Sequence, residues 1–125
     1  MLLDTCALLW LSQGGDALSS VAKARIESAA TVYVSVISGF EIGIKCRSGK
    51  LMLPASPDEW LSTVLAHHGL AAVPLDLSTC MLASQLPQVH RDPCDRMIIA
   101  TARQNRWPIV TADARFKEYG VEVIW

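Results

Sequence analysis

The sequence predicts one α/β domain in which a parallel sheet is covered by helices on both faces. Short β-like runs alternate with amphipathic helical segments along the whole chain. The 125 residues contain no repeat or linker, so a single domain over 1–125 is expected. Hydrophobic residues make up 51% and charged residues 18%, a balance that excludes a disordered chain.

The first half of the chain predicts two strands and four helices. Met1–Leu3 is apolar and Thr31–Val34 is β-branched or aromatic, so each predicts a strand. Helical spacing, with Ser35 as a cap and Gly14, Gly49 and Gly69 as stops, predicts helices over residues 5–11, 20–29, 35–47 and 57–68.

The second half predicts three strands and three helices. The clearest helix covers Pro93 to Arg106, because Asp92 is a good cap and Pro93 suits the first helical turn. The other predicted helices cover residues 77–86, before Pro87, and 114–119. Strands are expected over residues 71–75, 109–111 and 121–125.

Charge and cysteine content narrow the classes of function. Lys plus Arg is 11 and Asp plus Glu is 12, so the net charge of −1 excludes nucleic-acid binding by bulk positive charge but leaves a local basic patch open. The four cysteines have no C-x-x-C or zinc-finger spacing, which predicts reduced thiols. With no signal peptide or membrane segment recognised, we expect a cytoplasmic protein without membrane association.

Four carboxylates stand at chemically informative positions. Asp4 follows the first strand, Asp95 lies in the first turn of the clearest helix, and Asp113 follows the strand at 109–111. Glu41 lies in a strongly apolar part of the helix that begins after Ser35. Since strand-to-helix junctions of a parallel sheet share one edge, we expect the four side chains to face one crevice.

Carboxylates gathered in a crevice repel one another, so they have raised pKa values or need a cation. Oxygen ligands alone suit Mg²⁺ or Mn²⁺ better than zinc. Such an ion supplies a water nucleophile and stabilises charge on a phosphate. The pattern therefore predicts hydrolysis of a phosphodiester.

Simpler explanations exist for each acid alone. Asp4 and Asp113 could be helix caps, Asp95 could favour the helix dipole, and Glu41 could pair with Lys45 four residues on. Asp92 is interpreted mainly as a cap, and whether it joins the site stays open. A zinc site formed by His90, Asp92, Cys94 and Asp95 is a less favoured alternative.

Together these segments resemble the PIN-domain (PilT N-terminus) ribonucleases, especially the VapC-type toxins of bacterial toxin–antitoxin pairs. The resemblance covers essentially the whole chain and rests on four motifs in order: Leu2-Leu3-Asp4-Thr5, Val34-Ser35-Val36-Ile37-Ser38 leading to Glu41-Ile42-Gly43-Ile44-Lys45, His90-Arg91-Asp92-Pro93-Cys94-Asp95-Arg96-Met97-Ile98-Ile99-Ala100, and Val110-Thr111-Ala112-Asp113. One departure is Cys94, which stands where the family often has an aromatic residue.

The resemblance implies a three-layer PIN-like fold with a central, mainly parallel five-stranded sheet. It implies Mg²⁺- or Mn²⁺-dependent endonucleolytic cleavage of RNA, with Thr5 and Thr111 as supporting polar residues and Asp4, Glu41, Asp95 and Asp113 as the metal-binding and catalytic acids. It also implies a homodimer that is inhibited by a cognate antitoxin of a type II toxin–antitoxin system.

Three basic residues are candidates for RNA contacts. Lys45 and Arg47 lie at the end of the Glu41 helix, and Arg96 is adjacent to Asp95. Two alternative functions stay open: a PIN-like domain that binds RNA without cutting it, and a receiver-like signalling domain. The receiver interpretation is weaker, because Asp4 is followed by Thr5-Cys6 rather than by another acid.

Overall fold

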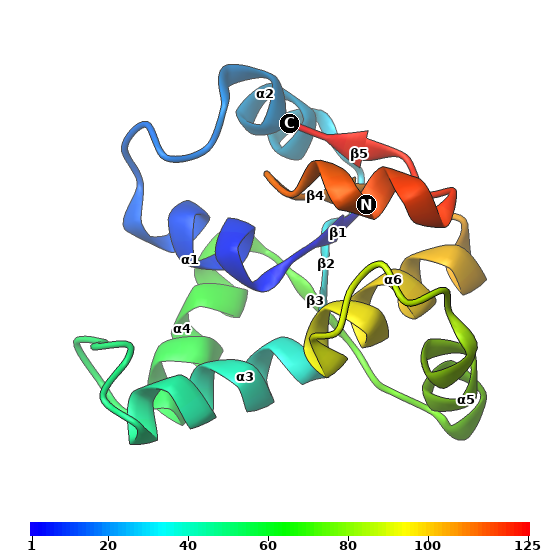
Figure 1. The fold of residues 1–125 in the computed structure, drawn as a ribbon. Helices are drawn as coiled ribbons and strands as arrows, with labels where there is room; N and C mark the ends of the chain where they lie inside the picture. Colours follow the sequence, from blue (N-terminus) through cyan, green and yellow to red (C-terminus); the bar gives the residue numbers. More distant parts are fainter.

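The computed structural model describes all 125 residues and contains one five-stranded sheet in the order β3-β2-β1-β4-β5 (Figure 1). Every strand pairing is parallel, so the predicted sheet type is confirmed. The strands are β1 (Leu2–Leu3), β2 (Tyr33–Ser35), β3 (Ala71–Val73), β4 (Ile109–Val110) and β5 (Val123–Ile124).

Seven helical segments connect the strands, and side-chain caps explain where they begin. Asp4, Ser35 and Asp92 are among the caps, and each accepts a hydrogen bond from a backbone N–H of the first helical turn. The helices are α1 (Thr5–Gln13), α2 (Ser20–Ser28), α3 (Val36–Arg47), α4 (Pro57–His68), α5 (Leu77–Gln85), α6 (Pro93–Asn105) and the 3₁₀-helix η1 (Ala114–Tyr119).

The sheet separates two apolar clusters because successive strand residues point to opposite faces. Leu3 and Val110 pack into the cluster with α1 to α4, whereas Leu2 and Ile109 pack into the cluster with α5, α6 and η1. These four side chains are fully buried. The three-layer arrangement expected from the sequence is therefore present.

The strands are shorter than predicted. Thr111 lies beyond β4, Pro74 and Leu75 lie beyond β3, and the last strand covers only Val123–Ile124. The segment at 114–119 is a 3₁₀-helix rather than an α-helix. Strands of two residues can form the centre of this sheet because β1 and β4 are buried on both faces and each pairs with a neighbouring strand on both sides.

The strand order creates a switch point between β1 and β4. These strands are neighbours, but β1 continues through α1 and α2 to β2 on one side, whereas β4 continues through η1 to β5 on the other. Ligands in open parallel sheets bind outside the carboxyl ends of strands at such a point. No helix in the chain is both long and apolar enough to cross a membrane.

Candidate active site

Asp4 and Asp113 follow the two strands that flank the switch point. Asp4 follows β1, is 8% exposed, and accepts a 2.7 Å hydrogen bond from the Ala7 N–H. Asp113 lies three residues after β4 and caps η1 by accepting from the Arg115 N–H at 3.0 Å. Both carboxylates are caps and also line one pocket together with Asp95, so the cap explanation and the site explanation are compatible.

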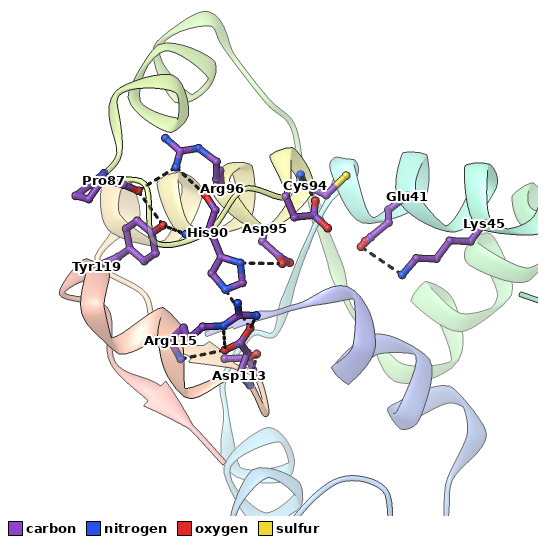
Figure 2. Close-up of polar contacts among 12 residues, drawn as sticks. Glu41, Lys45, Pro87, His90, Cys94, Asp95, Arg96, Asp113, Arg115 and Tyr119 are labelled. Atoms are coloured by element: carbon purple, nitrogen blue, oxygen red, sulfur yellow. Dashed lines mark hydrogen bonds and ion pairs between the residues drawn. The ribbon is translucent and has the colours of Figure 1, made fainter. Parts of the chain in front are cut away.

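Two helices bring the other acids to the same edge. Asp95 lies in the first turn of α6, and Glu41 lies in the middle of α3 with a side chain that is 11% exposed. Figure 2 shows Glu41 and Asp95 pointing toward the same space between α3 and α6. Asp4 and Asp95 each repel Glu41 strongly enough to perturb a carboxyl pKa in this group.

The pKa values of the acids divide into two groups. Burial, followed by repulsion from Asp92, Glu41 and the other acids, raises the pKa of Asp95 to about 7. Burial also raises the pKa of Asp4 and Glu41. In contrast, hydrogen bonds from Arg115 lower the pKa of Asp113 to about 2.

Two buried hydroxyls support the acids. The fully buried Thr111 accepts a hydrogen bond from the Asp113 N–H at 3.1 Å, and its hydroxyl offsets part of the rise in the pKa of Asp4. Thr5 donates to the Ser38 hydroxyl at 2.9 Å, which ties α1 to α3, and it lies close enough to Glu41 to lower the pKa of that carboxyl. The structure thus places both predicted supporting residues beside the acids.

Two residues that contact Asp113 were not predicted from the sequence. Arg115 donates from Nε to Asp113 Oδ1 at 3.0 Å and from Nη2 to Oδ2 at 2.7 Å. His90, considered above only as a zinc ligand, is 4% exposed and lies between Asp95 and Asp113 (Figure 2). The Arg115 contact follows from its place two residues after a cap, but nothing in the local sequence reveals the His90 contacts.

The donor set fits a hard divalent cation better than zinc. Glu41 Oε2 is buried and has no hydrogen-bond partner, an arrangement that is unfavourable unless a cation or proton compensates it. The acids offer only oxygen donors, which Mg²⁺ and Mn²⁺ prefer over the nitrogen and sulfur donors typical of zinc sites. The four acids lie near one another, but no three His, Cys, Asp or Glu residues have the geometry that holds a metal ion.

Asp92 is the cap of α6, as expected. Its Oδ1 atom accepts from the Cys94 N–H at 2.8 Å, and the residue is exposed. Its charge still raises the pKa of Asp95 and Glu41. The charge of Asp92 therefore affects the pKa values of the acidic site, although the residue itself lies at the exposed edge of that site.

The three basic residues proposed for RNA contact differ in placement. Lys45 Nζ lies 3.8 Å from Glu41 Oε1 with a side chain that is 40% exposed, and Arg47 is exposed at the end of α3. Arg96 is 7% exposed, and its guanidinium donates to backbone carbonyls of the segment before α6. The expectation that Arg96 contacts RNA is therefore wrong: the side chain faces away from solvent because these carbonyls saturate its N–H groups.

Known proteins resemble this chain over nearly all of its length. The PIN domain family matches residues 1–122. The chain is 32% identical over 120 residues to Ribonuclease VapC22 of Mycobacterium tuberculosis, with 95% of this chain and 91% of the relative covered.

Solved structures share the fold. A crystal structure of VapBC2 from Rickettsia felis bound to a promoter DNA fragment matches with a TM-score of 0.70 and 15% identity, covering 98% of this chain and 95% of that chain. FitAcB from Neisseria gonorrhoeae matches with a TM-score of 0.67 and 20% identity, covering 98% and 94%. From the family match and the relative that extends over almost the whole sequence, we conclude that the chain belongs to the PIN-domain family.

Proposed function

We propose that this chain is a Mg²⁺- or Mn²⁺-dependent endoribonuclease and the toxin of a type II toxin–antitoxin pair. The observation that carries the proposal is the meeting of Asp4, Glu41, Asp95 and Asp113 at the switch point of the sheet, with one buried Glu41 oxygen unpartnered. The relationship to a protein named as a ribonuclease supports RNA as the substrate.

The four acids would hold the divalent ion. When bound, the ion would lower the pKa of a water molecule and neutralise charge on the scissile phosphate. The chain's own groups prepare the site: the Ala7 N–H and the Thr111 hydroxyl orient Asp4, while Lys45 balances part of the charge on Glu41. The exposed Lys45 and Arg47 side chains are suited to meet RNA phosphates beside the acids.

The partners follow from the same proposal. One structure similar in fold is described as a toxin–antitoxin complex, and two others, of VapBC2 and FitAB, are described as bound to DNA fragments. We propose that a cognate antitoxin binds this chain and blocks its site, and that the free toxin is a homodimer. The intact set of acids favours cleavage over RNA binding without cleavage.

The direct test is cleavage of single-stranded and structured RNA by purified, antitoxin-free protein. We expect cleavage with Mg²⁺ or Mn²⁺, none with EDTA, and recovery when the metal is restored. Asp4→Asn and Asp95→Asn are expected to abolish cleavage while the circular dichroism spectrum is retained. The matched control is Asp92→Ser, which keeps a capping side chain but removes a rim charge, and which we expect to cut RNA.

Two outcomes would contradict the proposal. One is the absence of cleavage by the wild type under every divalent metal tested, and the other is full cleavage by both Asn variants. The toxin role is tested in cells: expression of this chain alone is expected to arrest growth, and co-expression of the neighbouring antitoxin gene is expected to relieve the arrest. Continued growth under strong expression of the active nuclease would exclude the toxin role.

A further inference from the structure

His90 lies between two acids that belong to different elements. Its Nδ1 atom is 3.5 Å from Asp95 Oδ2, and its Nε2 atom is 3.0 Å from Asp113 Oδ2 (Figure 2). The Nε2 contact is close but not aligned as a hydrogen bond. One imidazole therefore faces the carboxylates of both α6 and the segment after β4.

The imidazole ring is held by packing. It is 4% exposed, and it meets the ring of Phe116 edge-on with centroids 5.0 Å apart. Tyr119 lies nearby with its ring centroid at 6.4 Å. Both aromatic residues belong to η1, the helix that Asp113 caps, so the packing that fixes the ring also fixes the backbone of Asp113.

The backbone of His90 is held as firmly as its ring. The Tyr119 hydroxyl accepts from the His90 N–H at 2.6 Å and donates to the Pro87 carbonyl at 2.9 Å. Arg96 donates to the His90 carbonyl at 3.0 Å and to the Leu86 carbonyl at 2.7 Å. Burial of an arginine charge is costly unless its donors are satisfied, and here they are satisfied by the segment that carries His90.

These contacts argue against the two other roles that a histidine at this place could have. A direct metal ligand is disfavoured because both ring nitrogens already lie against carboxylate oxygens of the proposed ligands, at 3.5 Å and 3.0 Å. A proton-transfer role toward substrate is disfavoured because the ring is buried and both nitrogens face carboxylates. The role that remains for His90 is to control the positions of the two carboxylates.

We propose that His90 is a positioning residue that holds Asp95 and Asp113 in the arrangement required for binding the divalent ion. This inference rests on the proposed metal-dependent function. Groups that orient metal ligands from behind typically change metal affinity or activity by about 10- to 100-fold when they are removed. Without the imidazole, Asp95 and Asp113 would lose the ring that lies between them.

Three substitutions separate the contacts from the packing. His90→Phe keeps a ring and removes both nitrogens. His90→Gln places an amide nitrogen near the Nε2 position, which faces Asp113, and His90→Asn places one near the Nδ1 position, which faces Asp95. Val64→Ala is the stability control, because Val64 is buried in the other apolar cluster, away from the site.

The measurement is Mn²⁺ binding by calorimetry, with thermal unfolding of each variant and without RNA. We expect His90→Phe to raise the Kd for Mn²⁺ by about 10-fold or more. His90→Gln is expected to recover more affinity than His90→Asn, because its contact is the shorter one. Val64→Ala is expected to lower the Tm and leave the Kd unchanged. In cleavage assays at saturating metal, His90→Phe is expected to lower kcat without changing KM for RNA, since the ring does not reach the surface.

The results distinguish this inference from the proposed function. If the wild type binds no Mn²⁺ and cuts no RNA, the nuclease proposal fails and the role of His90 fails with it. If the wild type binds and cuts, but His90→Phe matches Val64→Ala in Kd, only the role of His90 is overturned. If His90→Phe does not fold, the Gln and Asn variants decide the question. Equal loss of Mn²⁺ affinity in these two variants would overturn the role of the nitrogen contacts.

Discussion

The two sides of the acidic site are compensated differently. On the β4 side, Asp113 receives two hydrogen bonds from the Arg115 side chain and faces His90, and its pKa falls to about 2. On the α3 and α6 side, burial raises the pKa of Glu41, and burial with repulsion from the other acids raises the pKa of Asp95 to about 7. Carboxylates in one pocket therefore experience opposite electrostatic environments.

This difference indicates which of the acids require a cation for charge compensation. The protein itself neutralises Asp113, whereas the nearest cation to Glu41 is the Lys45 ammonium at 3.8 Å, and Glu41 Oε2 has no partner. Burial and like charge favour protonation of these acids unless a positive charge is supplied. A divalent ion is thus expected to gain most of its binding energy from the Glu41 and Asp95 side.

The largest expected effect on Mn²⁺ affinity comes from replacing one acid on each side of the site with its uncharged amide. We expect Glu41→Gln to weaken Mn²⁺ binding by about 100-fold or more, and Asp113→Asn to weaken it by about 10-fold. Loss of Glu41 removes an uncompensated ligand, whereas loss of Asp113 also frees Arg115. Calorimetry with Mn²⁺ measures both values, and a larger effect of Asp113→Asn would contradict the comparison.

The second prediction concerns pH. Because the pKa of Asp95 is raised to about 7, this carboxyl is protonated below that value and must lose its proton to bind a cation. We expect Mn²⁺ affinity to fall by up to about tenfold per pH unit below pH 7. Titrations between pH 8 and 5.5 test this, and an affinity that is constant over that range would show that Asp95 is ionised throughout.

The third prediction concerns stability without metal. The folded-state pKa of Asp95 lies above its unfolded value, so its ionisation destabilises the fold progressively as pH rises from about 4 to 7. Asp95→Asn removes this cost, and we expect a gain of about 1 kcal/mol at pH 8 after allowing for solvent screening of a partly exposed group. The gain is expected to disappear near pH 4.

Chemical denaturation in EDTA measures that gain in free energy of unfolding. Addition of Mn²⁺ is expected to reverse the order, because the ion stabilises the folded wild type and binds the variant weakly. An Asp95→Asn variant that is less stable than the wild type at pH 8 in EDTA would show that Asp95 is already compensated.

The smallest effect is expected at Arg115. Arg115→Gln removes an exposed pair with Asp113, so the pKa of Asp113 is expected to rise toward its ordinary value. The carboxyl remains ionised at neutral pH, and the Kd for Mn²⁺ is expected to change by less than about threefold. Carboxyl NMR titration follows the pKa of Asp113, and an unchanged value would remove Arg115 as the cause of the difference.

Much of the fold could be predicted because its signals are local. Pro57 and Gly69 bound α4, Asp92 and Pro93 begin α6, and a β-branched and aromatic run ending at Val34 marks β2. Strand ends were less predictable: β3 ends before Pro74, and β4 ends at Val110 although the Thr111 N–H still donates to the Ile124 carbonyl at 3.3 Å. The residue pattern predicted five strands, and the structure confirms that number.

The candidate site was predictable only in part. The gathering of Asp4, Asp95 and Asp113 followed from the rule that junctions of a parallel sheet share an edge. The role of Arg96 was predicted incorrectly, because adjacency to Asp95 does not show which way a helical side chain points.

The sequence by itself determined the alternation of elements, the helix caps and the positions of the acids along the chain, because these depend on neighbours within a few residues. Only the tertiary structure decided that His90 lies between Asp95 and Asp113 and that one oxygen of Glu41 has no partner. The reason is physical: charge compensation depends on burial and on distances of a few ångströms between segments, and these are set only when the helices pack against the sheet.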